Sequence, residues 1–312
     1  MSSERQRSLN FEDGIDFSGV LTNPILDIAA RFWERDRYEA FKICYLSMRR
    51  IDDLVDYRKV SAGHITQGEA EKLSQIMLDW LDAVRNGDTS DPFRGAFIDI
   101  LARFEIPFRP WERLYASMVY DVTHDGYSSL LSFLRYCEGA AIAPASVFMH
   151  LCGVSRVNGQ YCAPNFDIRR ASRPLALFCY IVHILRDFQK DHLNNLNYFA
   201  DNLLSHYALT RKDLRKIAEG GPISLSFRNL IAAYISVAEY YRAKARQMMR
   251  EINRLLRPRY QLSLEIIYQL YFQVFERINP SRSRFSGSEL NPSPDEVRRR
   301  IQTTVNSFRP IS

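Results

Sequence analysis

The sequence predicts an all-α protein, and three features of the chain carry this prediction. Glycine is scarce, with 13 in 312 residues, below the usual share of ~7%. Runs in which apolar and polar residues alternate, as in half-buried strands, are hard to find. Apolar residues instead recur at intervals of three and four positions, and several such segments open with a capping residue. No linker or fixed-period repeat divides residues 23–280, so we expect one helical domain there.

The helices of the first half are marked by their caps. Asn23 and Pro24 combine an N-cap with a proline at the first helical position, which predicts a helix start. Thr66 and Glu69 form a capping-box pattern ahead of a strongly amphipathic segment. The other helices of this half are expected over 37–58, 91–104, 111–122 and 128–152.

The last of these segments contains YCEGAAIAPAS, in which Pro144 stands among small residues. A proline inside a helix removes a backbone hydrogen bond and usually kinks the helix. The small side chains favour close helix packing when taken alone. Beside a ligand site, they would instead leave room for a substrate.

In the second half, residues 155–166 are expected to form a loop, followed by a helix that carries Asp187 and Asp191. Thr210 and Asp213 mark the start of a short helix. Two long helices are expected over 224–256 and 259–279.

The two ends of the chain differ from this domain in composition. Residues 1–22 are polar and are predicted to form a flexible arm. Residues 281–312 are rich in Ser, Pro and Arg, and we expect a mobile tail with a short helix at 295–308.

Composition and charge restrict the class of protein. No apolar run reaches the ~18 residues of a membrane span, and the first residues lack the apolar core of a signal peptide. We therefore expect a cytoplasmic protein whose five scattered cysteines are reduced and buried. The net charge of +6 suits phosphorylated ligands, anionic membrane surfaces or nucleic acid. No nucleic-acid-binding module is recognisable, so nucleic acid is not expected as a partner.

Two acidic motifs far apart in the chain define the candidate site. In YLSMRRIDDLVD, helical spacing places Tyr45, Arg49, Asp52 and Asp56 on one stripe. In YIVHILRDFQKD, the corresponding stripe has four positions, and Arg186 lies beside it. These positions are Tyr180, His183 or Ile184, Asp187 and Asp191. We expect the two stripes to be facing walls of one site.

The paired carboxylates predict a magnesium site. Each pair belongs to an apolar helix that would otherwise be buried, and buried carboxylates require a cation or hydrogen-bond donors. Mg²⁺ selects oxygen ligands and usually keeps waters and phosphate oxygens, so such a site would bind diphosphates. The di-iron, EF-hand and glycine-loop patterns are absent. In the alternative, the carboxylates are solvated on helix faces or pair with Arg49, Arg50 and Arg186.

RRIDDLVD, YCEGAA and ILRDFQKD, in this order and at this separation, resemble the squalene/phytoene synthase family of head-to-head prenyltransferases. The resemblance extends from about residue 31 to residue 278. It implies an isoprenoid-synthase fold with a central cavity that holds two prenyl diphosphates on Mg²⁺ ions.

The resemblance also implies roles for individual residues. The metal-binding and catalytic carboxylates would be Asp52, Asp56, Asp187 and Asp191, with Asp53 as an adjoining metal-binding acid. Substrate-binding positions would be Arg49, Tyr45, Tyr136 and Arg186, together with Tyr180 and His183, which stand where the family often has Gln and Asn. Asp121 matches an acid that precedes the Tyr136 helix.

Further departures affect the surroundings of these residues. Glu138 and Pro144 alter the YCEGAA helix, and Lys190 stands where the family commonly has Glu. These changes, with Tyr180 and His183, leave the metal-binding carboxylates in place but touch the expected surroundings of the diphosphates, so the substrate and the second step of the reaction stay open.

The activity implied is Mg²⁺-dependent condensation of two farnesyl or geranylgeranyl diphosphates to a squalene- or phytoene-type product through a cyclopropyl intermediate. Two alternatives stay open: a related terpene cyclase or hydrolysing variant that acts on one prenyl diphosphate, and a non-catalytic scaffold. A lipid product and a basic chain are compatible with peripheral membrane association. The motifs decide neither NADPH use nor the oligomeric state.

Overall fold

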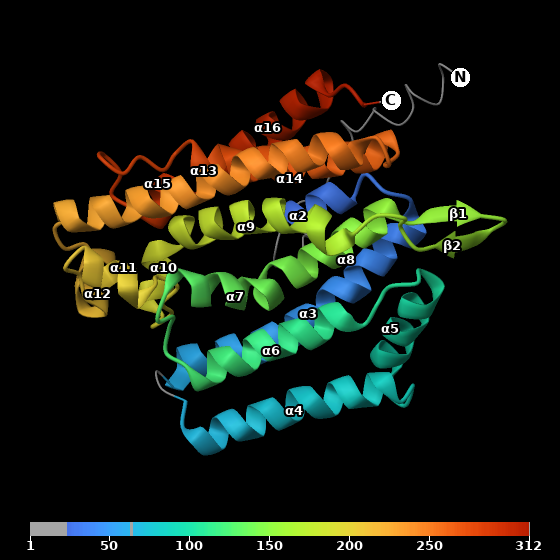
Figure 1. The fold of residues 1–312 in the computed structure, drawn as a ribbon, viewed down its shortest axis with the longest axis horizontal. Helices are drawn as coiled ribbons and strands as arrows, with labels where there is room; N and C mark the ends of the chain where they lie inside the picture. Colours follow the sequence, from blue (N-terminus) through green and yellow to red (C-terminus); the bar gives the residue numbers. More distant parts are fainter. Residues whose placement is uncertain (1–23, 63–64, 312) are drawn as a thin grey trace.

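A computed structural model describes residues 24–62 and 65–311, and helices dominate it (Figure 1). In chain order the helices of the first half are α2 (Pro24–Ala30), α3 (Arg35–Ala62), α4 (Gln67–Arg85), α5 (Pro92–Arg103), α6 (Arg109–Thr123), α7 (Leu130–Ala140) and α8 (Ile142–Gly153). Those of the second half are α9 (Ile168–Arg186), α10 (Phe188–Leu193), α11 (Asp201–His206), α12 (Arg211–Ala218), α13 (Leu225–Asn253), α14 (Pro258–Phe275), α15 (Gly287–Leu290) and α16 (Pro294–Ser307). The all-α prediction is confirmed. The arm expected over 1–22 lies outside the described residues.

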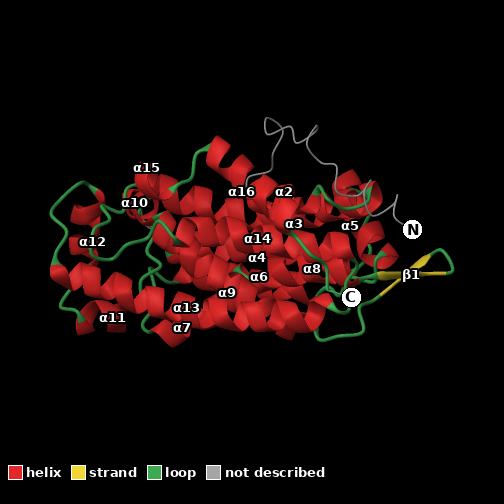
Figure 2. Cartoon of the chain, turned by 90° about the horizontal axis from the view of Figure 1, so that it is seen from above, coloured by secondary structure: helices red, strands yellow, loops and turns green. Residues whose placement is uncertain are grey.

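Helix α9 lies at the centre of the packing. It contacts α8, α13 and α14, and α3 contacts both α6 and α8. Figure 1 shows the long helices running roughly along one direction in layers, with α4 at one edge and α16 at the other. The view from above shows the same lengthwise packing (Figure 2). The arrangement brings α3 and α9, which carry the two acidic motifs, to opposite sides of the interior.

The caps expected from the sequence form where both partners are described. Thr66 accepts a hydrogen bond from the backbone N–H of Glu69, whose side chain returns to the backbone of Thr66. Thr210 and Asp213 form the same capping box at the start of α12. These local bonds satisfy backbone donors that a helix start leaves without partners.

The helix expected over 128–152 is interrupted, so two helices stand in place of one kinked helix. Ala141 separates α7 from α8, and Pro144 lies in the first turn of α8. Without an N–H, Pro144 cannot continue the hydrogen bonds of α7, whereas a first helical turn needs no such donor. The proline therefore ends one helix and is accommodated at the start of the next.

The expected loop at 155–166 contains a β-hairpin of strands β1 (Ser155–Val157) and β2 (Gln160–Cys162). Asn158 and Gly159 connect the strands with φ angles of 50° and 86°. Positive φ at both central residues is the requirement of the turn that Asn-Gly favours in hairpins. The Asn-Gly pair is visible in the sequence, but the strands are too short to show an alternation of apolar and polar residues.

Residues 281–311 are packed against the domain, which corrects the expected mobile tail. Helix α16 contacts α14, and Phe285, Leu290 and Ile301 are buried. Near the end of the chain, Ile311 exchanges backbone hydrogen bonds with the Gln261 side chain, at 2.8 and 2.9 Å. The Ser, Pro and Arg content concealed a few apolar residues at helical spacing, which are enough to attach the segment.

None of the helices in residues 24–62 and 65–311 is long and apolar enough to cross a bilayer. All five cysteines are free thiols, and four of them are buried, as expected.

Candidate active site

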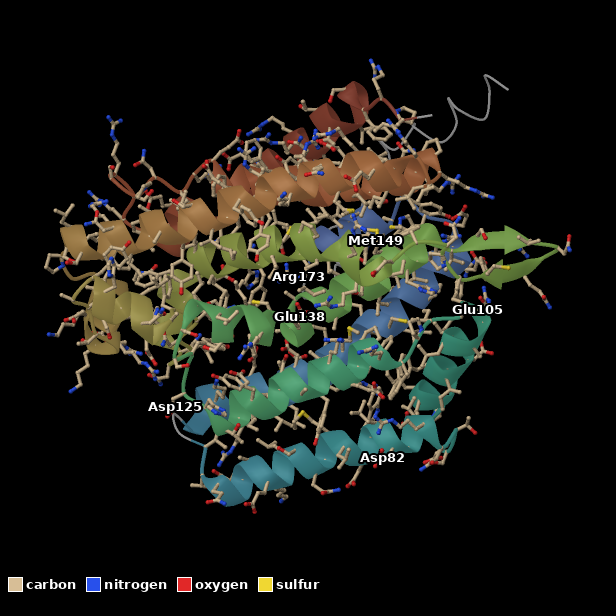
Figure 3. The ribbon with its side chains drawn as sticks, in the orientation of Figure 1. Asp82, Glu105, Asp125, Glu138, Met149 and Arg173 are labelled. Atoms are coloured by element: carbon tan, nitrogen blue, oxygen red, sulfur yellow. The ribbon has the colours of Figure 1, made fainter. Side chains whose placement is uncertain are left out.

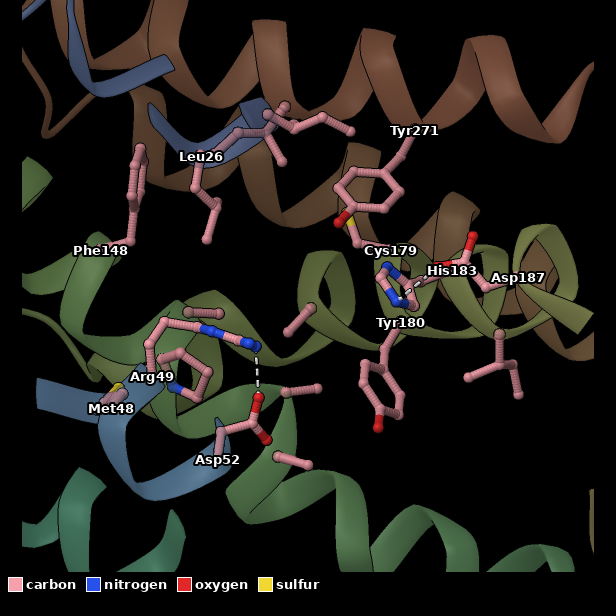
Figure 4. A pocket seen from close by; sticks show the side chains of 18 of the residues that line it. Leu26, Met48, Arg49, Asp52, Phe148, Cys179, Tyr180, His183, Asp187 and Tyr271 are labelled. Atoms are coloured by element: carbon pink, nitrogen blue, oxygen red, sulfur yellow. Dashed lines mark hydrogen bonds and ion pairs between the residues drawn. The ribbon is translucent and has the colours of Figure 1, made fainter. Parts of the chain in front are cut away.

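A cavity of about 460 Å³ lies between the helices that carry the acidic motifs. Its walls come from α2, α3, α6 to α10 and α14, together with residues that follow α10. Figure 4 shows Arg49 and Asp52 of α3 on one side and Tyr180, His183 and Asp187 on the other. The structure thus brings together two segments separated by more than a hundred residues of sequence.

On the α3 wall, Tyr45, Arg49, Asp52 and Asp56 all line the cavity, as the helical stripe predicts. The Arg49 guanidinium donates a hydrogen bond of 2.5 Å to Asp52 and a second hydrogen bond to Asp53. The Asp53 side chain is 56% exposed and does not line the cavity. The structure therefore places Asp53 outside the wall, as a partner of Arg49.

On the opposite wall, Tyr180, His183, Arg186, Asp187 and Asp191 line the same cavity. The expected continuous helix breaks at Asp187, which is the C-cap of α9 and the residue before α10. The Asp191 N–H still donates to the Asp187 carbonyl at 2.8 Å, so the turn between the two aspartates is preserved. Both carboxylates consequently stay on the cavity side. We call these five residues, together with Lys190, the α9–α10 wall.

The Asp187 carboxylate is held by neighbouring side chains. Arg186 donates to its two oxygens at 2.6 and 2.9 Å. Arg186 also donates to Nδ1 of His183 at 3.0 Å, so the proton of a neutral His183 lies on Nε2. That nitrogen is 3.2 Å from Asp187 (Figure 4). Asp187 is therefore oriented by two residues of its own wall.

The carboxylates differ in their pKa values. Burial, followed by the charge of Asp56, raises the pKa of Asp52 to about 7, and burial raises that of Asp56 to about 6. Burial and the charge of Asp187 raise the pKa of Asp191 to about 8. Burial also acts on Asp187, but the hydrogen bond and charge of Arg186 outweigh it and lower the pKa. For Asp52, Asp56 and Asp191, nearby positive charge and hydrogen bonds thus do not offset the cost of burying an ionised carboxylate.

The donor set fits Mg²⁺ held together with a phosphate ligand. Among the described residues, Asp56 and Asp191 accept no side-chain hydrogen bond, and Asp56 is close enough to raise the pKa of Asp191. No three acidic, His or Cys side chains within 24–62 and 65–311 are grouped closely enough to hold one ion. Mg²⁺ commonly binds through one or two carboxylates, with waters and phosphate oxygens completing the shell. The walls therefore supply carboxylate ligands and leave room for those oxygens.

The far end of the cavity is apolar. Leu26 and Phe148 lie away from Asp187 in Figure 4, and Leu264 and Ile267 of α14 add apolar side chains to the cavity lining. Ala140, Ala141, Pro144 and Ala145 also line the cavity. The apolar end offers a binding surface for a hydrocarbon chain.

In the small-residue segment, one residue permits close helix packing, and others leave open space in the cavity. A side chain on Gly139 would lie 2.1 Å from the Arg113 carbonyl oxygen, so this glycine permits close packing of α6 and α7. The alanines and Pro144 face the cavity instead. Small residues thus serve packing at one position and leave open space at the next.

Tyr136 and Tyr180 line the cavity within a group of tyrosines. The rings of Tyr127 and Tyr136 are 5.1 Å apart, and Tyr198, which follows the second motif, also lines the cavity. Burial and the charge of Asp121 raise the pKa values of Tyr127 and Tyr136, and Asp121 accepts a hydrogen bond of 2.7 Å from Lys59. Tyr198 and Tyr271 were not predicted from the sequence, because neither belongs to a motif stripe.

Glu138, expected near the diphosphates, does not line the cavity. Its carboxylate accepts hydrogen bonds from Arg169 at 2.7 and 2.9 Å and from Arg173 at 3.1 Å. Figure 3 shows Glu138 on α7 beside Arg173 on α9. This departure from the family pattern therefore joins two helices outside the cavity.

Comparisons with known proteins agree with these features. Phytoene synthase 1 from Zea mays is 23% identical over 243 residues, covering 78% of this chain and 55% of the relative. Phytoene synthase from Mycobacterium tuberculosis is 26% identical over 169 residues, covering 54% and 50%. The chain spans about half the length of the curated relatives it matches.

Two solved structures share the all-helical fold. A dehydrosqualene synthase in complex with ligand aligns with a TM-score of 0.71 at 15% identity, covering 97% of both chains. Squalene synthase HpnC from Alicyclobacillus acidocaldarius aligns with a TM-score of 0.62 at 17% identity, covering 85% of this chain and 88% of that one. The family profile of squalene/phytoene synthase matches residues 27–302. The chain therefore belongs to the squalene/phytoene synthase family, a family of prenyltransferases.

Proposed function

We propose that the protein catalyses Mg²⁺-dependent head-to-head condensation of two prenyl diphosphates to a squalene- or phytoene-type hydrocarbon. The observation that carries the proposal is the cavity, in which two aspartate-bearing walls face each other and an apolar end extends away from them. A diphosphate requires the first feature, and a prenyl chain requires the second. Family membership supports the same reaction class.

The aspartates would hold the metal. Asp56 and Asp191 accept no side-chain hydrogen bond from any described residue, and Asp52 and Asp187 would join them with their arginine partners nearby. Bound Mg²⁺ would neutralise the charge that builds on a diphosphate as the allylic C–O bond breaks. Arg49 and Arg186 place guanidinium groups on the same cavity surface, where they can bind phosphate oxygens.

The apolar and aromatic lining would protect the reacting carbons. An allylic cation is destroyed by water, so the site must exclude it around the hydrocarbon. Leu26, Phe148 and Leu264 provide apolar surface, and Tyr45 and Tyr136 add aromatic rings to the lining. The second prenyl diphosphate would supply its C2=C3 double bond as the nucleophile toward C1 of the first, whose own diphosphate leaves as pyrophosphate. Loss of a proton from that C1 would then close the ring of a cyclopropyl diphosphate intermediate.

Product analysis tests the proposal. Purified protein is incubated with Mg²⁺ and either farnesyl or geranylgeranyl diphosphate, and the extract is examined by mass spectrometry with NADPH present or absent. We expect pyrophosphate release and a C30 or C40 hydrocarbon. Release with only monomeric alcohols or cyclic terpenes would instead identify a one-substrate terpene synthase. Absence of turnover with every chain length would identify a scaffold.

A further inference from the structure

Three cationic side chains line the cavity within the described part of the chain: Arg49, Arg186 and Lys190. Both arginines form ion pairs with carboxylates of neighbouring residues. Arg49 binds Asp52 and Asp53, and Arg186 binds Asp187. Lys190 therefore differs from the other two cations.

Lys190 forms no ion pair or side-chain hydrogen bond among residues 24–62 and 65–311, although two carboxylates are near it. Its charge lowers the pKa values of both Asp187 and Asp191. The Lys190 side chain is exposed to the cavity and solvent. An ammonium group in this position can bind an incoming anion without first breaking a protein contact.

The charges of the two walls differ because of this residue. On the α3 wall, Arg49 pairs with Asp52 and, outside the wall, with Asp53. Asp56 forms no ion pair among the described residues, although the charges of Arg49 and Lys59 act on it. Asp187 and Asp191 are accompanied by two cations, Arg186 and Lys190, and by a neutral His183. With its carboxylates ionised, the α9–α10 wall therefore has balanced formal charges, whereas ionised Asp52 and Asp56 outnumber the one cation that lines the cavity on the α3 wall.

We propose that Lys190 binds a substrate diphosphate directly through its ammonium group. The inference rests on the proposed function and identifies a binding residue that the acidic motifs do not include. Lysine acts on phosphate as a compact point charge and supplies up to three hydrogen-bond donors. Part of the charge neutralisation on this wall therefore comes from the protein, and the need for metal there is reduced.

Titration calorimetry with inorganic pyrophosphate provides the test, with EDTA and separately with Mg²⁺. Loss of one charge-assisted hydrogen bond should weaken metal-free binding by roughly tenfold to a hundredfold in Lys190→Gln. Lys190→Arg should retain most of the affinity, and Lys190→Glu should bind pyrophosphate only with Mg²⁺. Lys216→Gln, an exposed lysine of α12, is the matched control and should bind as the wild type does.

Two results would overturn the inference: no pyrophosphate binding by the wild type in EDTA, or equal metal-free affinity of Lys190→Gln and wild type. KM for the prenyl diphosphate separates this inference from the proposed function. If the wild type turns over and Lys190→Gln has the same KM and the same pyrophosphate affinity, the Lys190 inference is refuted and the proposed function stands. Lys190-dependent pyrophosphate binding without turnover of any prenyl diphosphate refutes the proposed function and supports the binding residue.

Discussion

The two walls of the cavity carry the same pair of aspartates but differ in how the protein holds them. On the α3 wall, one continuous helix presents Asp52 and Asp56, and Arg49 is divided between Asp52 and Asp53. On the α9–α10 wall, Asp187 ends one helix and is held by Arg186 and His183. The comparison shows that equal motif spacing does not produce equal electrostatics. The α3 wall has the greater need for an added cation.

Loss of Asp56 should produce the largest effect, because this carboxylate has no side-chain donor among the described residues. We expect Asp56→Ala to lower kcat/KM by about a thousandfold, equivalent to ~4 kcal/mol of transition-state stabilisation. Steady-state assays of pyrophosphate release measure the effect, and circular dichroism checks that the helices persist.

Asp53→Ala is the matched control, since Asp53 lies three residues away on the same helix but outside the cavity wall. Its activity should stay within about threefold of the wild type, as for other exposed ion pairs. Equal loss in the two variants would show that both aspartates hold the metal and would remove the distinction drawn for the α3 wall.

Breaking the ion pair between Lys59 of α3 and Asp121 of α6 should have the next largest effect. Lys59 pairs with Asp121 at 2.7 Å, and both side chains are largely buried. Lys59→Met leaves Asp121 without its partner and should cost about 3 kcal/mol of unfolding free energy, measured by urea denaturation. The double variant Lys59→Met/Asp121→Leu should recover most of this loss. If Lys59→Met has the same unfolding free energy as the wild type, the ion pair does not stabilise the fold.

The sequence was sufficient to predict the two stripes and their meeting in one site. Helical periodicity fixes which side chains share a face, so Tyr45, Asp52 and Asp56 could be placed together without coordinates. The facing of the two stripes was inferred from their matching pairs of carboxylates, since periodicity alone cannot pair distant helices, and the family resemblance agreed with it. Caps such as Thr66 and Thr210 succeeded because they are local.

The features that were missed depend on contacts between distant segments. The attachment of α16 to α14 depends on where Ile301 meets a partner helix, which local composition does not reveal. The helical stripe already left Asp53 out, since adjacent helix residues lie about 100° apart, and only the family resemblance gave Asp53 a metal-binding role. The hydrogen bonds that fix His183 depend on side-chain rotamers, which spacing cannot determine.

The raised pKa of Asp191 predicts a pH effect on the stability of the metal-free protein. A folded pKa of about 8, against an ordinary value of 3.8, means that the folded state binds more protons between these values. Stability should therefore fall as pH rises from 5 to 8.5, and Asp191→Asn should weaken this dependence. At pH 8.5 with EDTA, we expect the variant to melt roughly 5 °C higher than the wild type.

Thermal melts with and without Mg²⁺ extend this test to the metal. Added Mg²⁺ should raise the Tm of the wild type most at high pH, where the carboxylates are ionised, and should raise that of Asp191→Asn less. Asp79→Asn, on the exposed face of α4, should follow the wild type under all conditions. A steeper pH dependence in Asp191→Asn would contradict the assigned burial of the charge.

The smallest effect is expected for His183, which orients Asp187 without carrying charge. Burial and the charge of Arg186 lower its pKa to about 4, so the imidazole is neutral at physiological pH. His183→Phe keeps a ring of similar shape but removes both polar contacts, and it should lower kcat/KM by about tenfold, or ~1.4 kcal/mol. The pH–rate profiles of the variant and the wild type should remain parallel between pH 6 and 8. If the wild-type profile changes slope near pH 6.5 and the profile of the variant does not, His183 titrates during turnover. Both walls would then contain an ionising group that catalysis uses.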